Sequence, residues 1–274
     1  MKKRHNEKWE NDKTSSRQVM ESYRASLDKE FQDDSDCSLA LPTYRGTQVE
    51  FDLGIEYSNS KDPLDRTAGA YLLGQLGWGD QCFLEESVDA LIPLLSDNDV
   101  RVICAAGFAL GHRMHSKAVP PLSKLVEHPD EEVRYSVVHG LLGLEDSLAI
   151  DCLIRFSQDP DSDVRDWSLM GLGTLIEIDT PKIRETLFHA IQDADYDARC
   201  EAILGLAIRG DKRVVDILLI EMERDSIGQM IIEAAEEIAD PSLHSKLVEL
   251  SETLEMDGDE SWRAHLDSAI RACK

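Results

Sequence analysis

Small and apolar residues recur along the chain at positions that share one face of a helix. They are best counted from a repeated slot, which arginine fills in six of seven units and which an aspartate precedes by four residues. Offsets +3, +4 and +7 from this slot carry small or apolar side chains, and such offsets lie on one side of an α-helix. The slots are 35, 33, 31, 34, 30 and 34 residues apart. A period of this length indicates stacked helical hairpins.

The aspartate of each unit predicts where a helix begins. Its carboxylate accepts hydrogen bonds from the first free N–H groups of a helix, and its charge suits the positive end of the helix dipole. We therefore place the start of the second helix of each hairpin directly after this aspartate. The aspartates and slots are Asp62/Arg66, Asp97/Arg101, Asp130/Arg134, Asp161/Arg165, Asp195/Arg199, Asp225/Gln229 and Asp259/Arg263.

These signals predict hairpins that each contain a first helix (A), an acidic turn and a second helix (B). The A helices are expected at 47–58, 86–95, 117–126, 148–156, 181–191, 212–222 and 242–252. The B helices are expected at 63–76, 98–111, 131–144, 162–177, 196–209, 226–239 and 260–273. The predicted fold class is therefore all-α, a right-handed α-solenoid of about seven helical-hairpin repeats.

The sequence divides into an extension and a repeat domain. Residues 1–46 are mostly polar, and we expect a partly flexible N-terminal extension there, with a helix near residues 17–31. Residues 47–274 form the predicted repeat domain. Within it, glycine recurs at offset +6 in four B helices, at Gly107, Gly140, Gly171 and Gly205. Because glycine is unfavourable inside a helix, its recurrence at one offset indicates close approach of another helix.

The repeat units resemble HEAT repeats of the phycobilisome-lyase-like type, whose pattern is Asp-x-x-Val-Arg followed by small and apolar residues. The segments DNDVRVICAAGFALG, DEEVRYSVVHGLLGL and DSDVRDWSLMGLGTL match this pattern, and AVPPLSKLV matches a typical A helix. The resemblance covers residues 47–273. It implies that the aspartates and arginines form a ladder between neighbouring repeats, with the weakest rung at Gln229. It implies little about function, because such repeats occur in scaffolds, lyases, hydroxylases and DNA-repair enzymes.

The composition is strongly acidic. The chain has 29 Lys and Arg against 54 Asp and Glu, which gives a net charge of −25. Residues 1–29 carry +3, so residues 30–274 carry −28. A field of this size repels nucleic-acid phosphates and anionic membranes and attracts cationic partners. The alternative is that the acidity serves only solubility.

Targeting and redox signals also bear on the class of protein. No apolar run approaches the roughly 20 residues that span a bilayer, and the basic residues 1–8 are followed by a polar stretch rather than a signal core. The six cysteines form no CxxC pair, and we interpret them as small hydrophobic residues rather than as disulfides or metal ligands. These features predict a cytoplasmic protein.

No motif in the sequence predicts catalysis, a metal or a cofactor. The acidic turns 159–163 and 193–197 resemble calcium loops, but the glycine and glutamate that such loops need at positions six and twelve are missing. The pair His112 and His115 is interpreted as a solvated helix end rather than a metal site. The chain has no His-Glu pair of an iron hydroxylase, no P-loop lysine, and no GxSxG or HExxH motif. We therefore predict a protein that is not an enzyme.

The remaining functional signal is the face of the B helices that points away from the core. In a solenoid the B helices line the concave side, and offsets +2 and +5 point away from the core offsets. Packing between neighbouring repeats is an equal alternative for Trp167, and Trp78 is either a second anchor or a plug of the repeat core. The predicted partner-binding residues, which occupy these offsets and the adjacent +1, are Tyr71, Tyr135, His139, Asp166, Trp167, Met170 and Glu201.

The sequence thus predicts a protein that binds another protein without catalysis. Its most concrete form is an inhibitor or immunity-type protein that neutralises a basic, nuclease-like toxin through an acidic concave surface, because complementary charge accelerates association. The partner would be a cationic protein rather than nucleic acid or membrane. A general protein-assembly scaffold and a bilin lyase or chaperone-type HEAT protein stay open as alternatives. The sequence does not predict an oligomeric state.

Overall fold

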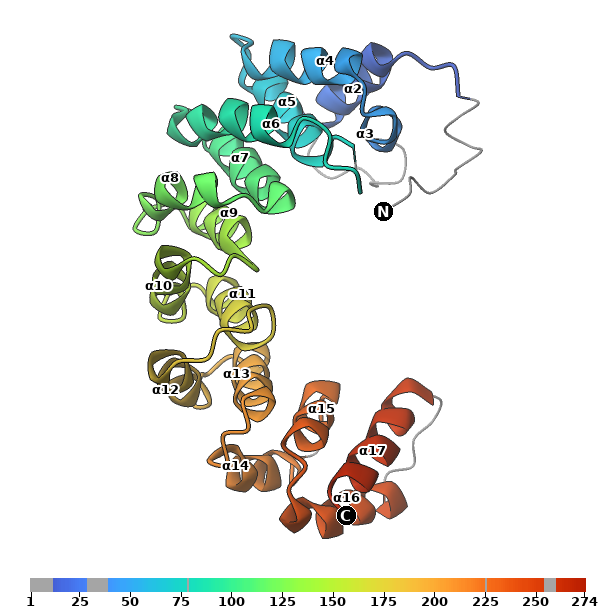
Figure 1. Ribbon diagram of the computed structural model, residues 1–274, viewed down its shortest axis with the longest axis vertical. Coiled ribbons are helices and arrows are strands. Elements are labelled where there is room, and N and C mark those ends of the chain that lie inside the picture. Colours follow the sequence, from blue (N-terminus) through green and yellow to red (C-terminus); the bar gives the residue numbers. More distant parts are fainter. Residues whose placement is uncertain (1–11, 29–38, 78, 225, 254–259) are drawn as a thin grey trace. The chain divides into compact units, whose positions relative to one another are not determined.

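The computed structural model describes residues 12–28, 39–77, 79–224, 226–253 and 260–274. These residues form helices joined by turns and contain no β-strand, which confirms the predicted all-α class. The chain divides into two compact units, residues 1–149 and 150–274, and each is described by itself (Figure 1). The sequence predictions that concern Cys37, Trp78, Asp225 and Asp259 lie outside the described residues.

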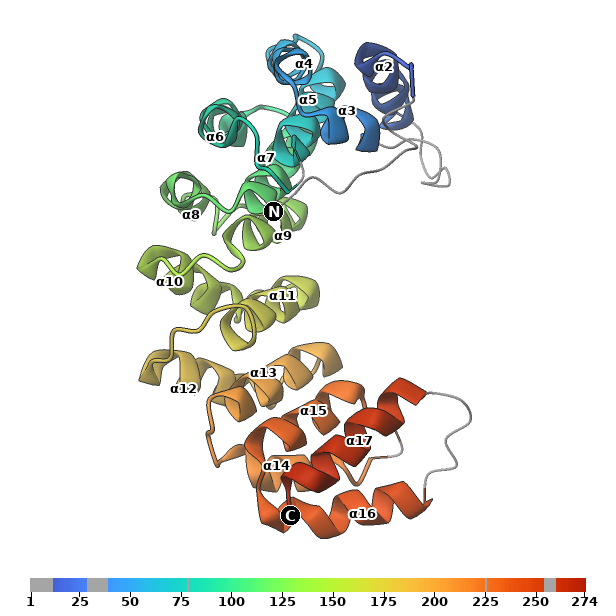
Figure 2. The same ribbon diagram turned by 45° about the vertical axis from the view of Figure 1, so that its right-hand side comes forward.

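In its described part, unit 1 contains two N-terminal helices and three hairpins. The N-terminal helices are α2 (Ser16–Ser26) and α3 (Ala40–Arg45). The A helices and their 3₁₀ extensions are α4 (Gln48–Ser58), α6 (Leu84–Leu91) with η1 (Ile92–Ser96), and η2 (Ser116–Ala118) with α8 (Val119–Ser123). The B helices are α5 (Pro63–Gln75), α7 (Val100–Arg113) and α9 (Glu131–Leu141). Helix α5 packs against α7, and α7 packs against α9, as Figure 2 shows.

Unit 2 continues the hairpin pattern from helix α10 (Ser147–Phe156), in which the boundary between the units falls. Its other A helices are α12 (Pro181–Ala190), α14 (Val214–Glu221) and η3 (Pro241–Leu243) with α16 (His244–Thr253). Its B helices are α11 (Ser162–Gly173), α13 (Tyr196–Ile208), α15 (Gln229–Ile238) and α17 (Glu260–Ala272), and each packs against the next. The hairpins confirm the predicted α-solenoid. The right hand of the superhelix and the domain boundary at residue 46 stay predictions.

The repeated aspartate begins most of the B helices in the predicted way. Asp62, Asp130, Asp161 and Asp195 are N-caps whose side chains accept hydrogen bonds from backbone N–H groups of the first turn. Helix α7 is different, because it begins at Val100 with Asp99 as its N-cap. The prediction that Asp97 caps this helix was therefore wrong. Asp97 instead accepts hydrogen bonds from Arg66 and from the backbone N–H of Asp99.

The slot arginine donates hydrogen bonds to the turn that precedes its own helix. Nη1 of Arg66 donates to the carbonyls of Ser60 and Lys61, at 3.1 and 3.0 Å. Arg134, Arg165 and Arg199 donate to the two equivalent carbonyls of their own turns. The interaction recurs because the slot lies one helical turn after a capped start, which places the guanidinium beside the turn backbone.

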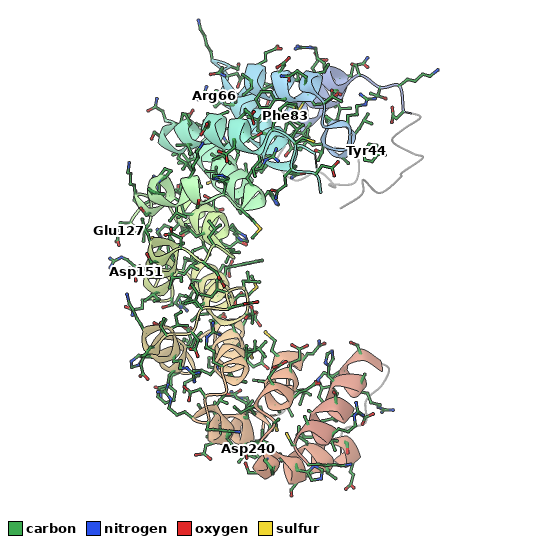
Figure 3. All side chains as sticks on the ribbon, in the orientation of Figure 1. Tyr44, Arg66, Phe83, Glu127, Asp151 and Asp240 are labelled. Carbon is green, nitrogen blue, oxygen red and sulfur yellow. The ribbon has the colours of Figure 1, made fainter. Side chains whose placement is uncertain are left out.

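The same arginine also joins neighbouring repeats where an aspartate is in reach. Nε of Arg66, which is labelled in Figure 3, donates to Oδ2 of Asp97 at 2.7 Å, and Nε of Arg165 donates to Oδ2 of Asp193 at 2.8 Å. The Arg66 pair uses the repeated aspartate of the next unit, as the resemblance implies, whereas the Arg165 pair uses Asp193, which lies two residues before the repeated Asp195. Arg101 departs from the implied ladder, because its guanidinium pairs with Asp99 in its own turn. The amide of Gln229 donates to Glu233 in its own helix, and the weak rung there stays a prediction.

Glycine at offset +6 allows two B helices of one unit to approach closely. A Cβ atom on Gly140 would lie 3.1 Å from the carbonyl oxygen of Gly107 on the preceding B helix. A Cβ atom on Gly205 would lie 2.6 Å from the Cα of Gly173. Both glycines therefore receive the preceding B helix, which confirms the packing role that the sequence predicts for them.

Two arginines outside the repeated slots are buried in the described structure. Arg113 is 2% exposed, and its guanidinium donates to the carbonyls of Leu73 and Leu76 at the end of α5. Arg209 donates to the carbonyls of Leu172 and Gly173 at the end of α11. Each guanidinium thus satisfies free carbonyls at the C-terminal end of the preceding B helix. At the same helix end His112 is exposed, so the burial concerns Arg113, for which the sequence made no prediction.

Candidate partner-binding surface

All seven predicted partner-binding residues lie on B helices, and all are partly buried. In unit 1 they are on α5 and α9, and in unit 2 they are on α11 and α13. Each unit therefore has its own set of partly exposed B-helix side chains. The set in unit 1 is Tyr71, Tyr135 and His139, and the set in unit 2 is Asp166, Trp167, Met170 and Glu201.

The set in unit 1 is aromatic and includes a residue that the sequence did not predict. Phe108 of α7 lies against Tyr135 and His139 of α9, with ring centroids 5.9 and 5.1 Å away. The rings of Tyr135 and His139 are themselves 4.7 Å apart in an edge-to-face arrangement. We call Phe108, Tyr135 and His139 the ring cluster. Phe108 was expected in the core at offset +7, and an aromatic side chain where four other units carry leucine is the signal that distinguishes it.

The imidazole of His139 is neutral within the ring cluster at physiological pH. Burial lowers the pKa of His139 to about 4, and the charge of His112 acts in the same direction. A neutral ring among aromatic neighbours adds apolar contact area without placing a fixed positive charge on this face. The ring cluster therefore suits a partner side chain that is apolar or cationic.

Tyr71 is not open in the way that the offset rule suggests. The ring of Tyr23, on helix α2, meets the ring of Tyr71 edge to face with centroids 6.2 Å apart. Burial of Tyr71 also raises the pKa of its hydroxyl. The structure therefore separates Tyr71, which α2 covers, from the ring cluster on α7 and α9.

The set in unit 2 contains two carboxylates that form no salt bridge with the described residues. Burial, and after it the charges of Asp197, Asp195 and Asp163, raise the pKa of Asp166 to about 6. One oxygen of Asp166 is buried without a hydrogen-bond partner among the described residues. An uncompensated carboxylate of this kind costs free energy in the isolated chain.

Glu201 repeats this arrangement on the neighbouring B helix. Burial, and after it the charges of Asp166, Asp197 and Glu233, raise the pKa of Glu201 to about 7. Its Oε2 atom is likewise buried with no partner among the described residues. Glu233 of α15, which the sequence analysis missed, is held by the amide of Gln229 at 2.6 Å. We call Asp166, Glu201 and Glu233 the carboxylate row, because they follow one another on α11, α13 and α15.

Two acidic residues on the A helices of unit 2, Asp151 and Glu185, have basic partners instead. Lys182 of α12 pairs with Asp151 of α10 at 2.6 Å, and Asp151 is labelled in Figure 3. Arg213, at the start of α14, pairs with Glu185 of α12 at 2.7 Å. Each basic side chain thus reaches the A helix of the preceding repeat. The two sides of the unit differ in compensation, since no described salt bridge reaches Asp166 or Glu201.

The arginines of α11 and α13 are committed elsewhere. Arg165 pairs with Asp193 across to the next turn, and Nη1 of Arg199 donates to the carbonyls of residues 193–195. Residues 150–274 as a whole carry 28 Asp and Glu against 13 Lys and Arg, a net charge of −15. The carboxylate row therefore lies in the more acidic of the two units. No Lys or Arg of the described residues forms a salt bridge with any of its three members.

Trp167 and Met170 lie beside the carboxylate row on α11, and both are partly buried. Partial burial agrees with contact to a partner and with packing between repeats, so both interpretations of Trp167 stand. The structure gives Trp167 no distinct role beyond its place next to Asp166. The prediction for Trp78 concerns a residue outside the described ones.

The described residues offer little for metal or thiol chemistry. They contain no group of three or more His, Cys, Asp and Glu side chains placed to hold a metal ion. The ring of His115 lies 2.9 Å from Glu85, and His112 is exposed. Burial raises the pKa of Cys104 and of Cys200 to about 11, which keeps both thiols protonated and unreactive at neutral pH.

Two further features of the described residues bear on ligands. A shallow depression of about 580 Å³ in unit 2 is lined by Tyr196, Glu223, Arg224 and Ser226. Glu223 and Arg224 are already paired with Lys246 and Glu221, so this depression offers no free charge to a ligand. No described helix is both long and apolar enough to cross a membrane.

Replacing Glu201 by glutamine is expected to stabilise the protein at pH 8 but not at pH 4. The pKa of Glu201 is higher in the folded chain than in the unfolded chain. Its stabilising contribution to the free energy of unfolding is therefore fully present at pH 4 and is lost as the pH rises through about 7. After allowance for solvent screening, we expect a gain of about 1 kcal/mol at pH 8. Urea unfolding at both pH values measures it. Glu185→Gln is the matched control, and an equal gain there would contradict the assignment.

Comparisons with known proteins agree with this architecture. The family model of HEAT repeats matches residues 88–173 and 155–239. Protein YibA of Escherichia coli K12 is 30% identical over 207 residues, which cover 73% of each chain. A crystal structure of Escherichia coli YibA superposes with a TM-score of 0.68 at 23% identity, over 100% of this chain and 98% of that one. An engineered protein with a TM-score of 0.53 and 15% identity, over 93% of this chain and 78% of that one, shares the fold. The chain therefore belongs to the HEAT-repeat family.

Proposed function

We propose that this chain binds a basic protein through its B helices and neutralises it as an inhibitor or immunity-type protein. HEAT-repeat solenoids are protein-binding scaffolds, because stacked repeats offer an extended surface. The observation that carries the proposal is the difference between the two sides of unit 2. Asp151 and Glu185 on the A helices have basic partners, whereas Asp166 and Glu201 on the B helices have none among the described residues.

A basic partner would supply the charge that Asp166 and Glu201 lack. Carboxylates that are already partly desolvated lose little further hydration when a lysine or arginine reaches them, and the low local dielectric strengthens the resulting pair. The partner's cations also lower the pKa of both carboxylates, so binding should release protons near pH 6 to 7. The net charge of −15 on residues 150–274 accelerates the encounter with a positive surface.

A nuclease-like toxin fits this chemistry better than a generic basic protein. Enzymes that cleave nucleic acids bind phosphates with clustered lysine and arginine side chains. A row of carboxylates on successive helices presents negative charges to such a cleft and competes with the nucleic acid for the same cations. Blockade of the cleft requires no catalysis by the inhibitor, and the proposal is accordingly a non-catalytic one.

The ring cluster of unit 1 would add contact energy to this charge recognition. Aromatic residues that are partly buried in the free protein lose little conformational entropy on binding and are common at energetic hot spots. Tyr135 and His139 hold each other at 4.7 Å, so their positions are fixed before a partner arrives. The proposed division of roles is therefore aromatic contact in unit 1 and charge pairing in unit 2.

Affinity purification from the native cell tests the proposal. The tagged chain is expected to retain one basic protein in stoichiometric amount, and that protein should lose its nuclease activity at a 1:1 ratio. Its association rate should fall at least about tenfold between 50 mM and 500 mM salt, because steering by charge is screened. Association that does not depend on salt would contradict the electrostatic mechanism. Weak capture of several unrelated proteins would favour the general scaffold, and retention of a coloured tetrapyrrole would favour the lyase.

A further inference from the structure

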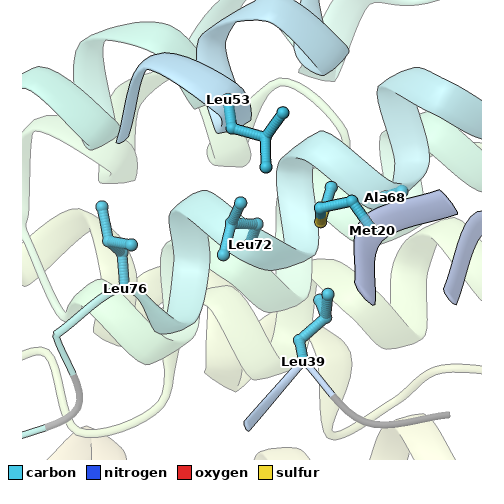
Figure 4. Packing of buried hydrophobic residues seen from close by; sticks show 6 residues of the cluster. All are labelled: Met20, Leu39, Leu53, Ala68, Leu72 and Leu76. Atoms are coloured by element: carbon cyan, nitrogen blue, oxygen red, sulfur yellow. The ribbon is translucent and has the colours of Figure 1, made fainter. Parts of the chain in front are cut away.

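Helix α2 occupies the face of the first hairpin that has no preceding repeat. Met20 of α2 is fully buried, and it packs in one cluster with Leu53 of α4 and Leu72 of α5 (Figure 4). Leu72 stands at offset +6, where Gly140 and Gly205 receive the preceding B helix in later hairpins. In the first hairpin Leu72 fills this position, and Met20 of α2 lies in the same apolar cluster.

An ion pair of α2 also copies the ladder between repeats. Arg24 pairs with Asp62, the N-cap of α5, and with Asp65 at 3.1 Å. Arg66 makes the equivalent pair with Asp97 of the following repeat. Helix α2 therefore reproduces both contacts that a preceding repeat would make, one apolar and one ionic.

The other contacts of α2 with the first hairpin are also polar. Ser16 Oγ donates to Glu50 Oε1 at 2.6 Å, and Arg17 pairs with Glu56 at 2.6 Å. The face of α4 and α5 thus presents four acidic side chains, Glu50, Glu56, Asp62 and Asp65, to a helix that carries two arginines. This is the charge complementarity that the proposed function requires of the partner, here formed within one chain.

The contacts that hold α2 on the first hairpin are individually weak. Only Ser16 and Met20 of α2 are buried. The side chains of Arg17 and Glu56 are 52% and 56% exposed, and exposed ion pairs contribute little to stability. An isolated helix of this length is also marginal in water. A longer helix with the same pattern would make the same contacts and more of them.

We infer that the face of α4 and α5 beneath α2 is a docking site for a basic helix of the partner, with α2 as its intramolecular occupant. The inference rests on the proposed function. The fitting helix carries an apolar side chain four residues before an arginine, as Met20 precedes Arg24. Its binding displaces α2 and uncovers Tyr71, which Tyr23 of α2 covers. The partner thereby gains the acidic face of the first hairpin together with one further aromatic ring.

Exchange of α2 by an added peptide tests the inference on the full chain. The probe is a labelled synthetic peptide of residues 12–28, which contains α2. At saturation it is expected to increase deuterium uptake in residues 16–26 of the full chain and to leave α11 and α13 unchanged.

Met20→Ala in the full chain loosens the resident helix, so the affinity for the peptide should rise about tenfold. A peptide with Arg24→Ala should bind at least about tenfold more weakly, which matches a lost charge-assisted pair.

The outcomes separate this inference from the proposed function. Peptide binding that leaves residues 16–26 protected would overturn the inference, as would no binding to either form of the chain. Deuterium uptake in α7 and α9 of the Met20→Ala chain reports whether unit 1 is still folded. Arg24→Ala in the full chain is a second variant that loosens α2 without a change in the core, because it removes the pairs with Asp62 and Asp65. The Asp166→Asn and Glu201→Gln chain should bind the peptide normally, because those carboxylates are in unit 2. A chain that exchanges α2 but captures no basic protein would refute the proposed function alone.

Discussion

Replacing Asp166 and Glu201 together by lysine is expected to weaken binding of the basic partner by about 100-fold, a loss of about 3 kcal/mol. Both carboxylates have a buried oxygen with no hydrogen-bond partner among the described residues, so a cation of the partner would supply their counter-charge. Lysine at both positions removes these pairs and opposes the partner's own positive charge. Isothermal titration calorimetry measures the loss, with octa-arginine as the probe until the natural partner is isolated.

The matched control carries the same change of charge on the other side of the unit. Asp151→Lys with Glu185→Lys replaces acids that already pair with Lys182 and Arg213. We expect this chain to lose no more than about fivefold in affinity, through the long-range field alone. An equal loss in both chains would mean that only total charge matters and that the carboxylate row is not a binding site.

A second variant replaces both carboxylates by neutral amides and controls for misfolding of the lysine variant. Asp166→Asn with Glu201→Gln removes negative charge that the fold does not compensate, so this chain should be at least as stable as the native one at pH 8. Its affinity for octa-arginine is expected to fall about tenfold. The affinity of the native chain should increase as the pH rises from 5 to 8, because the two carboxylates ionise with pKa values of about 6 and about 7. The neutral chain should show little of this pH dependence.

The spacing of the slots was sufficient to predict the hairpins, because one local rule generates them. An aspartate cap, an apolar helix face and a slot arginine all act within about two turns of helix. Asp62, Asp130, Asp161 and Asp195 obey this rule in the structure. Helix α7 breaks it, because Asp97 is taken by Arg66 of the preceding repeat. That competition is between segments 31 residues apart, and a local pattern cannot predict it.

The buried arginines show the same limit more clearly. Arg113 reaches a carbonyl 40 residues earlier, and Arg209 reaches one 37 residues earlier. Their offsets from the slots Arg101 and Arg199 differ, at 12 and 10 residues, so they form no periodic signal. The sequence predicts a helix near residues 17–31, which corresponds to α2, but it does not predict that this helix packs against the first hairpin. The one fully buried apolar anchor of α2, Met20, lies in a polar sequence.

The candidate site was predictable by position but not by electrostatics. The offset rule placed all seven predicted residues on partly exposed parts of B helices. It could not show which acids are neutralised, because the pairs of Lys182 with Asp151 and of Arg213 with Glu185 join different repeats. The total charge of −25 therefore does not show the difference between the paired acids on the A helices and the unpaired acids on the B helices. What distinguishes Asp166 and Glu201 is the lack of such a pair in the described structure.

Replacing Arg113 by methionine is expected to destabilise unit 1 by about 3 kcal/mol, because a buried charged donor is lost and its acceptors remain. The guanidinium donates to Leu73 O at 2.7 Å, to Leu76 O at 3.0 Å and to Ser87 Oγ at 3.3 Å. Burial lowers the pKa of Arg113 to about 10, so the side chain is still charged at neutral pH. Methionine recovers part of the cost of burying that charge but leaves the carbonyls at the end of α5 without donors.

Arg101→Met is the control, since Arg101 lies on the same helix and its one salt bridge among the described residues is with Asp99 at the surface. Thermal unfolding should begin about 10 °C lower for Arg113→Met, while Arg101→Met should change the stability by less than about 0.5 kcal/mol. Arg113→Lys separates charge from geometry. Its single ammonium cannot reach the three acceptors that the guanidinium serves, so it should restore less than half of the loss. Full stability in the lysine chain would show that charge alone, and not the fork of donors, holds α7 to the end of α5.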